Sequence, residues 1–154
     1  MIGLYKPRRE DLGFRQQLLS DEETMAYNHA WGGTISFPEE DWDSWYGWWV
    51  IDAGNKRFYR YLKDGECGFV GEIAYHFDED LGGFIADVIV HAQYRGLGFG
   101  GQALDLLCEA AKANGIEWLY DDIAADNPAV GLFLRHGFTE ESRTNDKIIL
   151  KKRL

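Results

Sequence analysis

The sequence predicts an α/β sandwich in which helices flank a mostly antiparallel, mixed β-sheet. The first observation is the order of the hydrophobic patterns, which change between helix and strand periods as β-α-α-α-β-β-β-α-β-α-β-β. The second is that turn signals separate these patterns, with no repeat or low-complexity segment among them. The third is the length of 154 residues, which fits one domain with its own core. We therefore expect a single domain over residues 1–154.

The N-terminal third carries one strand signal followed by three helical ones. Pro7 stops the strand, because proline lacks a backbone N–H group. The run Ser20-Asp21-Glu22-Glu23 resembles a capping box that starts the second helix, and Pro38 with two glutamates after it suits the first turn of the third. These signals predict a strand over 3–6, helices over 8–20, 20–27 and 39–51, and a loop over 28–37.

After Gly54-Asn55 the pattern changes to strands. Asp64-Gly65 between two aromatic runs is typical of a hairpin. Gly115 and Gly137 are suitable helix ends, since glycine adopts the left-handed conformation without a steric penalty. These signals predict strands over 57–63, 67–77, 84–90, 118–123, 138–144 and 147–152, and helices over 98–114 and 127–136.

A glycine-rich turn between a strand and a helix is the most informative motif. It has four glycines within six residues, and a purely structural turn would rarely use so many because each costs folding entropy. Such a turn presents free backbone N–H groups at the positive end of the helix dipole, where phosphate oxygens bind. The motif predicts a pyrophosphate site formed by Arg95, Gly96, Leu97, Gly98, Phe99, Gly100 and Gly101.

Composition argues against some classes of partner. The formal net charge is −10, with 26 acidic against 16 basic residues, which disfavours nucleic acid because its phosphates attract a basic surface. No apolar stretch approaches the length of a membrane span and the first residues do not resemble a signal peptide, so we expect a cytoplasmic protein without a membrane partner. Cys67, Cys108 and the histidines lack metal-ligand spacing, so we expect no metal.

The glycine turn also fits a dinucleotide-binding fingerprint through Gly96, Gly98 and Gly101, with Asp121 lying 20 residues further on. That fingerprint belongs in the first strand–helix unit of a long parallel domain, whereas only about 50 residues follow it here. A dinucleotide-binding protein is therefore a remote alternative.

The chain resembles the GNAT superfamily of N-acetyltransferases. The run 95–100 fits that family's acetyl-CoA signature of Arg or Gln, two residues, Gly, one residue, and Gly or Ala. Asp126-Asn127-Pro128 followed by the run 132–138, which closes with Gly-Phe, is similar to the family's downstream helix. The resemblance implies a sheet splayed at the cofactor strand, an acetyl-CoA-binding core over 57–150 and a variable acceptor-side segment over 1–56.

The resemblance also implies how acetyl-CoA, the co-substrate, is held. The glycine turn would grip its pyrophosphate, and the strand before it would pair with the pantetheine arm as an added strand does. The N–H of Val90 would polarise the thioester carbonyl. Asn127 is carried over as a pantetheine contact, although it also suits a helix cap, and Arg135 as a phosphate contact, although it also suits a solvated surface. Outside the turn, the cofactor residues are therefore Val88, Ile89, Val90, Asn127 and Arg135.

Two carboxylates interrupt apolar strands and are candidates for catalysis. Transfer to an amine needs the neutral amine, so a base must remove a proton. Asp87 lies just before the glycine turn and Glu72 in the neighbouring strand, and burial would raise the pKa of each toward a useful range. Either is expected to act as base or as anchor for a cationic substrate. The alternative is a carboxylate that faces solvent or pairs with an arginine.

The expected general acid is missing. The family often has a tyrosine where this sequence has Phe133, and that phenol protonates the departing CoA thiolate. Either Tyr94, Tyr120 or water replaces it, or the thiolate leaves unassisted. The substitution also keeps open a CoA-binding sensor module without turnover.

Aromatic residues mark the acceptor side. Trp42, Trp45, Tyr46 and Trp49 fall on one helical face, which either packs on the sheet or forms a wall of the acceptor pocket, where rings hold cations. The glycine-containing loop 28–33 is either an acceptor loop or an ordinary surface loop. The acceptor candidates are Asn28, Trp31 and Trp45.

Together these features predict an acetyl-CoA-dependent N-acetyltransferase that moves the acetyl group directly to a primary amine of a small molecule or peptide. No covalent intermediate is needed, since neither cysteine has a histidine partner nearby in the sequence. Aromatics on the helix 39–51 could also join two copies of the chain in a homodimer. The sequence leaves the acceptor open between polyamines, aminoglycosides, amino acids and protein N-termini.

Overall fold

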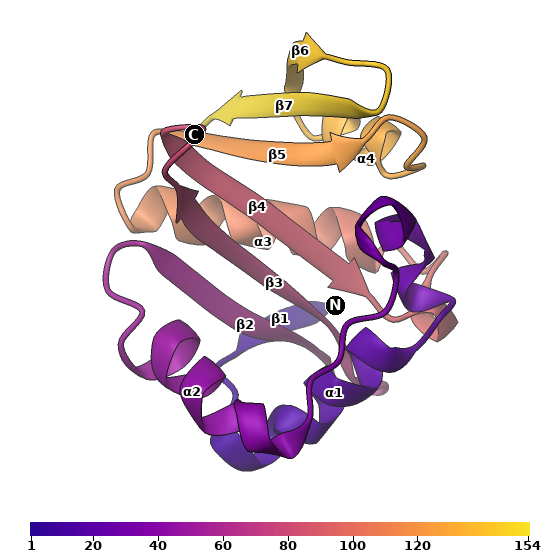
Figure 1. Ribbon diagram of the computed structural model, residues 1–154, viewed down its shortest axis with the longest axis vertical. Coiled ribbons are helices and arrows are strands. Elements are labelled where there is room, and N and C mark those ends of the chain that lie inside the picture. The colour runs from indigo at the N-terminus through magenta and orange to yellow at the C-terminus, as the bar shows by residue number, and fades with distance from the viewer.

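A computed structural model describes residues 1–154, and its centre is a seven-stranded sheet (Figure 1). The spatial order of the strands is β1-β2-β3-β4-β5-β7-β6. Every neighbouring pair is antiparallel except β4 and β5, which run parallel. The strands are β1 Ile2–Tyr5, β2 Arg57–Asp64, β3 Gly68–Asp78, β4 Gly83–Val90, β5 Trp118–Ala124, β6 Thr139–Arg143 and β7 Lys147–Arg153.

Helices cover both faces of this sheet. The long helix α3 crosses behind β3 and β4, whereas α1 and α2 lie on the near face (Figure 1). None of the helices has the length and apolar character needed to cross a membrane. The helices are α1 Leu12–Ser20, α2 Trp42–Tyr46, α3 Phe99–Ala113 and α4 Val130–Arg135, with 3-10 turns η1 Arg9–Asp11, η2 Thr24–Trp31, η3 Glu39–Asp41 and η5 Ala92–Tyr94 and a π-helical turn η4 Gly47–Ile51.

Alternation along β3 sends successive side chains into two separate cores. Ile73 packs with Leu104 and Leu107 of α3, and all three side chains are fully buried. The next residue, Ala74, packs on the opposite face with Tyr59 and Val50. Apolar burial on both faces therefore fixes β3, and with it the neighbouring strand β4, between two helical layers.

Strands β4 and β5 separate soon after they begin. They pair only at Phe84–Leu119 and Ile85–Tyr120, and the gap between them widens toward the end of β4 (Figure 1). The turn that follows β4 and the first turn of α3 lie at this open end. The expected fold class is confirmed: a mixed, mostly antiparallel sheet, flanked by helices and splayed at the strand before the glycine turn.

The seven strands match the expected ranges to within one residue at each end, and the helical expectations need correction. The loop expected over 28–37 was wrong in its first part, because η2 continues to Trp31 and ends only where Gly32 takes a φ of +104°. The capping-box assignment to Ser20 was also wrong. Ser20 ends α1 and bonds back to the carbonyl of Gln17, while Asp21 accepts the N–H of Thr24 at 2.9 Å.

The helix expected over 127–136 begins only at Val130. The side chain of Asn127 accepts the N–H of Ala129 at 2.9 Å, which holds a turn before the helix. The segment expected as one helix over 39–51 consists of the 3-10 turn η3, the α-helix α2 and the π-helical turn η4. In η4 the N–H of Asp52 donates to the carbonyl of Gly47 at 2.7 Å.

Candidate active site

The glycine turn presents a set of unpaired backbone donors. None of the N–H groups of residues 96–101 donates a hydrogen bond within the protein, and the first that does, Gln102, reaches the carbonyl of Gly98 at 3.4 Å. Gly96 and Gly98 have φ values of +80° and +84°, which other residues rarely adopt. Because these donors lie where α3 begins, they form a cradle that fits a diphosphate.

The last glycine of the turn serves the packing of two helices. A Cβ on Gly101 would lie 2.9 Å from Nε2 of His136, whose Nδ1 bonds to Asp105 at 2.8 Å. A Cβ on Gly100 would lie 3.2 Å from Leu132. The start of α3 therefore approaches α4 more closely than a larger residue would allow.

The backbone of β4 alternates between its partner β3 and the gap. The N–H of His91 donates to the carbonyl of Val70 at 2.8 Å, so by antiparallel alternation the polar groups of Ile89 also face β3. Those of Val88 and Val90 face the gap, where β5 no longer pairs. Val88 and Val90 therefore offer free backbone groups to an extended ligand, whereas Ile89 contributes only its side chain to the wall.

A cavity of about 680 Å³ runs from the glycine turn into the gap between β4 and β5. It brings together residues from both parts of the chain, including Asn28 and Trp31 from the acceptor-side segment. Asn127 and Phe133 also line it. Among the residues expected at the site, four lie outside its lining: Leu97, Tyr120, Arg135 and Trp45.

Each of these four has a local reason for its place. The ring of Tyr120 lies against Gly83, where an added Cβ would be 2.8 Å away. Arg135 is exposed, and Leu97 is 59% exposed on the outside of the turn. Trp45 packs edge-on against Tyr59 with ring centroids 4.7 Å apart. The aromatic face of the helical segment thus packs on the sheet, and Trp48, off that face, is 65% exposed.

Four carboxyl groups line the cavity: Glu72 on β3, Asp87 on β4, and Asp121 and Asp122 on β5. Burial raises the pKa of Glu72 to about 7, against the opposing charge of Arg15. Asp87 is open to the cavity, but the protein packed around it disfavours its charge and raises its pKa, while Arg15 and His76 oppose the rise. The pKa of Asp121 lies well above its usual range because burial and the nearby Asp87 both disfavour its charge.

The partners of these carboxyl groups differ. Glu72 accepts the hydroxyl of Tyr59 and lies 3.5 Å from Nε of Arg15. Asp87 forms no hydrogen bond within the protein, although its side chain is open to the cavity. Of Glu72 and Asp87, Asp87 is therefore the carboxylate that is free to take a proton from a ligand.

Sequence reasoning missed several groups of this site. Arg15 and Tyr27 line the cavity from the N-terminal segment, and His76 lines it from β3. Only the period-2 alternation of β3, which puts His76 on the same face as Glu72, was a signal that could have found one of them. Asp121 was noted only for a dinucleotide site, and it belongs here instead. The structure brings together no group of His, Cys, Asp and Glu that could hold a metal ion.

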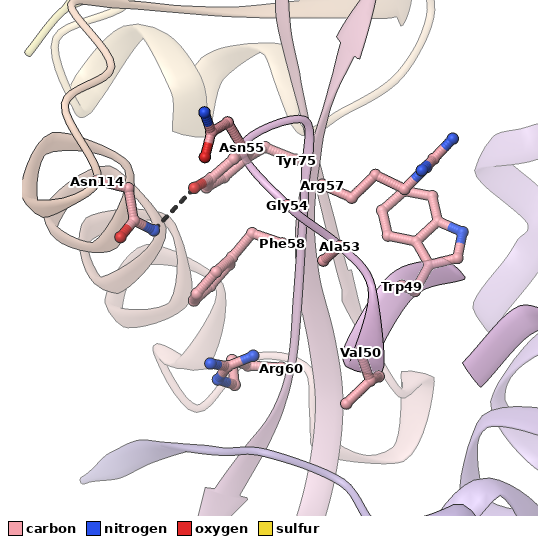
Figure 2. A pocket seen from close by; sticks show the side chains of 10 residues that line it. All are labelled: Trp49, Val50, Ala53, Gly54, Asn55, Arg57, Phe58, Arg60, Tyr75 and Asn114. Atoms are coloured by element: carbon pink, nitrogen blue, oxygen red, sulfur yellow. Dashed lines mark hydrogen bonds between the residues drawn. The ribbon is translucent and has the colours of Figure 1, made fainter. Parts of the chain in front are cut away.

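A second cavity, of about 280 Å³, lies between the end of η4, the start of β2 and the end of α3 (Figure 2). It contains two arginines and two asparagines, one of which, Asn114, donates to the hydroxyl of Tyr75 at 2.8 Å. Figure 2 shows Arg57 and Arg60 pointing to different sides. Because no carboxylate and no part of the glycine turn lines it, this cavity lacks the groups that transfer to an amine requires.

The fold is similar to those of solved N-acetyltransferases. Spermidine N-acetyltransferase from Vibrio cholerae, in complex with CoA and spermine, gives a TM-score of 0.79 at 19% identity, with 99% of this chain and 95% of that chain covered. Ribosomal-protein-alanine N-acetyltransferase from Brucella melitensis gives 0.76 at 21% identity, with 100% and 99% covered. PaiA N-acetyltransferase from Thermoplasma acidophilum, in complex with coenzyme A, gives 0.70 at 16% identity, with 100% and 99% covered.

No curated protein sequence matches this chain significantly. A model of the acetyltransferase (GNAT) family matches residues 17–138, which include the end of α1, the carboxylates of β3 and β4, and the glycine turn. Since this match spans well over half of the chain, the protein belongs to the acetyltransferase (GNAT) family.

Proposed function

We propose that the protein transfers the acetyl group of acetyl-CoA directly to a primary amine of a small molecule or peptide. The observation that carries this proposal is the cavity itself, which joins a cradle of unpaired N–H groups to the free carboxylate of Asp87 through the gap between β4 and β5. A donor held by its phosphates at the cradle and an amine held at Asp87 then meet within the cavity. The spermidine and ribosomal-protein-alanine acetyltransferases, which have the same fold, support an amine as acceptor.

The residues of the turn and of β4 hold the donor. The N–H groups of 96–101 bind its pyrophosphate, and Arg95 enters this turn. The guanidinium of Arg95 donates to the carbonyl of Thr24 at 2.8 Å, so it also fixes η2 beside the turn. Val88 and Val90 pair with the pantetheine arm, and the N–H of Val90 polarises the thioester carbonyl.

Asp87 prepares the acceptor. The ammonium group of the acceptor gives a proton to Asp87, and its nitrogen lone pair then forms a bond to the carbonyl carbon of the thioester, which acetyl-CoA supplies. The C–S bond breaks as the carbonyl re-forms, the electron pair leaves on sulfur as the CoA thiolate, and the second ammonium proton passes from the nitrogen to this thiolate or to solvent water. Of the tyrosines expected to protonate this sulfur, only Tyr94 lines the cavity, and Phe133 has no proton to give.

A thiol-release assay tests the proposal. Acetyl-CoA is offered with a panel of polyamines, amino acids, aminoglycosides and N-terminal peptides, and free thiol is measured over time. Amine-dependent release of thiol, with the acetylated amine found by mass spectrometry, is the expected result.

A CoA-binding module without turnover is the second candidate, and Phe133 is the observation that favours it. In that case acetyl-CoA raises the melting temperature of the protein, yet no amine in the panel is acetylated above the uncatalysed rate. Raised melting temperature together with turnover excludes the second candidate, and the absence of both overturns the cofactor assignment as well.

A further inference from the structure

Arg15 is a cationic group in the cavity that the transfer mechanism does not use. Its guanidinium carbon lies 4.5 Å from the ring centroid of Phe37, 4.3 Å from that of Trp45 and 5.7 Å from that of Tyr59. Two of these rings, Phe37 and Tyr59, are buried, and cation–π attraction to them favours the charged guanidinium and restricts its motion. The side chain is only 15% exposed and comes from α1, on the acceptor side of the cavity.

The donors of this guanidinium are largely unused. It forms no hydrogen bond within the protein, and its buried Nε makes only an ion pair, with Oε2 of Glu72 at 3.5 Å. Glu72 already accepts the hydroxyl of Tyr59, and its pKa of about 7 means that it is only partly charged near neutral pH. Because Arg15 lines the cavity, its terminal N–H groups have only the cavity to donate to.

A fixed guanidinium with two unpaired terminal nitrogens matches a carboxylate, which it binds through two parallel hydrogen bonds. Asp87, which would receive the proton of an ammonium group, lies on the same face of the sheet as Glu72. Asp87 pairs with Ala74 in the β3–β4 register, so it lies one diagonal step from Glu72, the residue nearest to Arg15. The acceptor part of the cavity therefore has a cationic and an anionic end that are close together.

We propose that the acceptor is an amine that carries its own carboxylate, of the amino-acid class, with Arg15 binding the carboxylate and Asp87 receiving the proton of the ammonium. This inference rests on the proposed function and selects one acceptor class from those that the sequence left open. It also explains why an arginine lies in the acceptor cavity of an acidic chain, where a simple polyamine would be repelled by it.

Matched acceptor pairs test the inference. Thiol release is measured for each of the common amino acids and for its decarboxylated amine, for example tyrosine with tyramine or tryptophan with tryptamine. The two members share the side chain and the amine, so the ratio of their kcat/KM values isolates the carboxylate. For the amino acids that are turned over, we expect this ratio to be about 100, the fold-change that a charge-assisted bidentate contact produces.

Two variants of Arg15 connect that ratio to the guanidinium. Arg15→Met should bring the ratio close to one by lowering kcat/KM for the amino acid alone, and Arg15→Lys should restore part of it because it keeps the charge without the planar fork. Arg9→Met is the matched control, since Arg9 also lies against an aromatic ring, Trp42, but pairs with exposed carboxylates outside the cavity. The rise in melting temperature on adding CoA shows that each variant keeps its fold and cofactor site.

The outcomes separate the inference from the proposed function. Turnover of the decarboxylated amines at the same rate as the amino acids, or an equal loss for both in Arg15→Met, overturns the inference and leaves the proposed function standing. No thiol release from any acceptor, with CoA still binding, overturns both.

Discussion

At the scale of single residues, two carboxyl groups on neighbouring strands have been given different roles by their surroundings. Glu72 is 3% exposed and has Tyr59 and Arg15 as partners. Asp87 has no hydrogen-bond partner and faces the cavity. Both pKa values are raised mainly by burial, yet only Asp87 has its oxygens free for a substrate. The two residues therefore give different predictions, one for activity and one for stability.

Asp87→Asn should lower kcat/KM by at least about 100-fold, because an asparagine cannot accept the proton of the ammonium. In the unaltered protein activity should fall as the pH drops through the raised pKa of Asp87, so the acid limb of the profile should lie above the ordinary aspartate range. Steady-state rates from pH 4 to 9 measure this. Asp43→Asn, at an exposed carboxylate paired with Arg9, is the control. An unchanged acid limb in Asp87→Asn rules out this base.

Glu72→Gln should flatten the dependence of stability on pH. The pKa of Glu72 is about 7 in the folded protein and near 4.5 in the unfolded chain, so the folded state binds more protons between these values. The free energy of unfolding should therefore fall as the pH rises from 5 to 8, with Glu72 accounting for about 3 kcal/mol of that fall. Urea unfolding at both pH values measures it. A fall of the same size in the variant contradicts the assignment to Glu72.

At the scale of elements, the glycines that end helices and the ranges of the strands could be predicted from the sequence. Contacts between residues far apart in the sequence could not. Gly115 and Gly137 both take the left-handed conformation and follow the ends of α3 and α4, as a local rule requires. The start of η2 was misassigned because Ser20 and Asp21 are both good caps, and only the fold decides between them. The place of Arg15 in the site could not be predicted, because the aromatic rings that surround it, Phe37, Trp45 and Tyr59, come from segments far away in the sequence.

Gly98→Ala should weaken the binding of CoA by about tenfold, because a left-handed alanine costs roughly 1–2 kcal/mol and the turn would relax away from the phosphate-binding geometry. Gly115→Ala is the matched control. It has the same φ of +84°, no atom within 4 Å of an added Cβ, and a place outside the cavity. Isothermal titration with CoA and urea unfolding measure the two effects. Both variants should lose similar stability, and a similar loss of CoA affinity in both would contradict the phosphate role of the turn.

At the scale of the whole molecule, the sheet consists of two parts that are held together by few strand contacts. Strands β1–β4 and β5–β7 pair with each other at only two positions, where β4 meets β5. The turn η2 lies beside the end of β5, at the wide end of the gap (Figure 1). It contacts the β5 side through His29, which lies 3.1 Å from Asp126, and the β4 side through the buried Thr24. A ligand in the gap therefore binds where these two parts and η2 meet.

Thr24→Val should loosen η2 and the turn after β4 together. The hydroxyl of Thr24 accepts the N–H of Ala92 at 2.9 Å and donates to Asp21, and a valine of similar shape leaves that partly buried N–H unpaired. A loss of about 1–3 kcal/mol in the free energy of unfolding is expected. Hydrogen exchange should become faster in both 24–31 and 91–95, and saturating acetyl-CoA should restore much of the protection, since a ligand that binds only the folded state stabilises it.

Ser20→Ala is the control. The hydroxyl of Ser20 is exposed and bonds only within α1, so exchange in both segments should stay unchanged. Faster exchange in 24–31 alone would mean that the two segments open independently, and the coupling of η2 to the cofactor turn through Thr24 would be wrong.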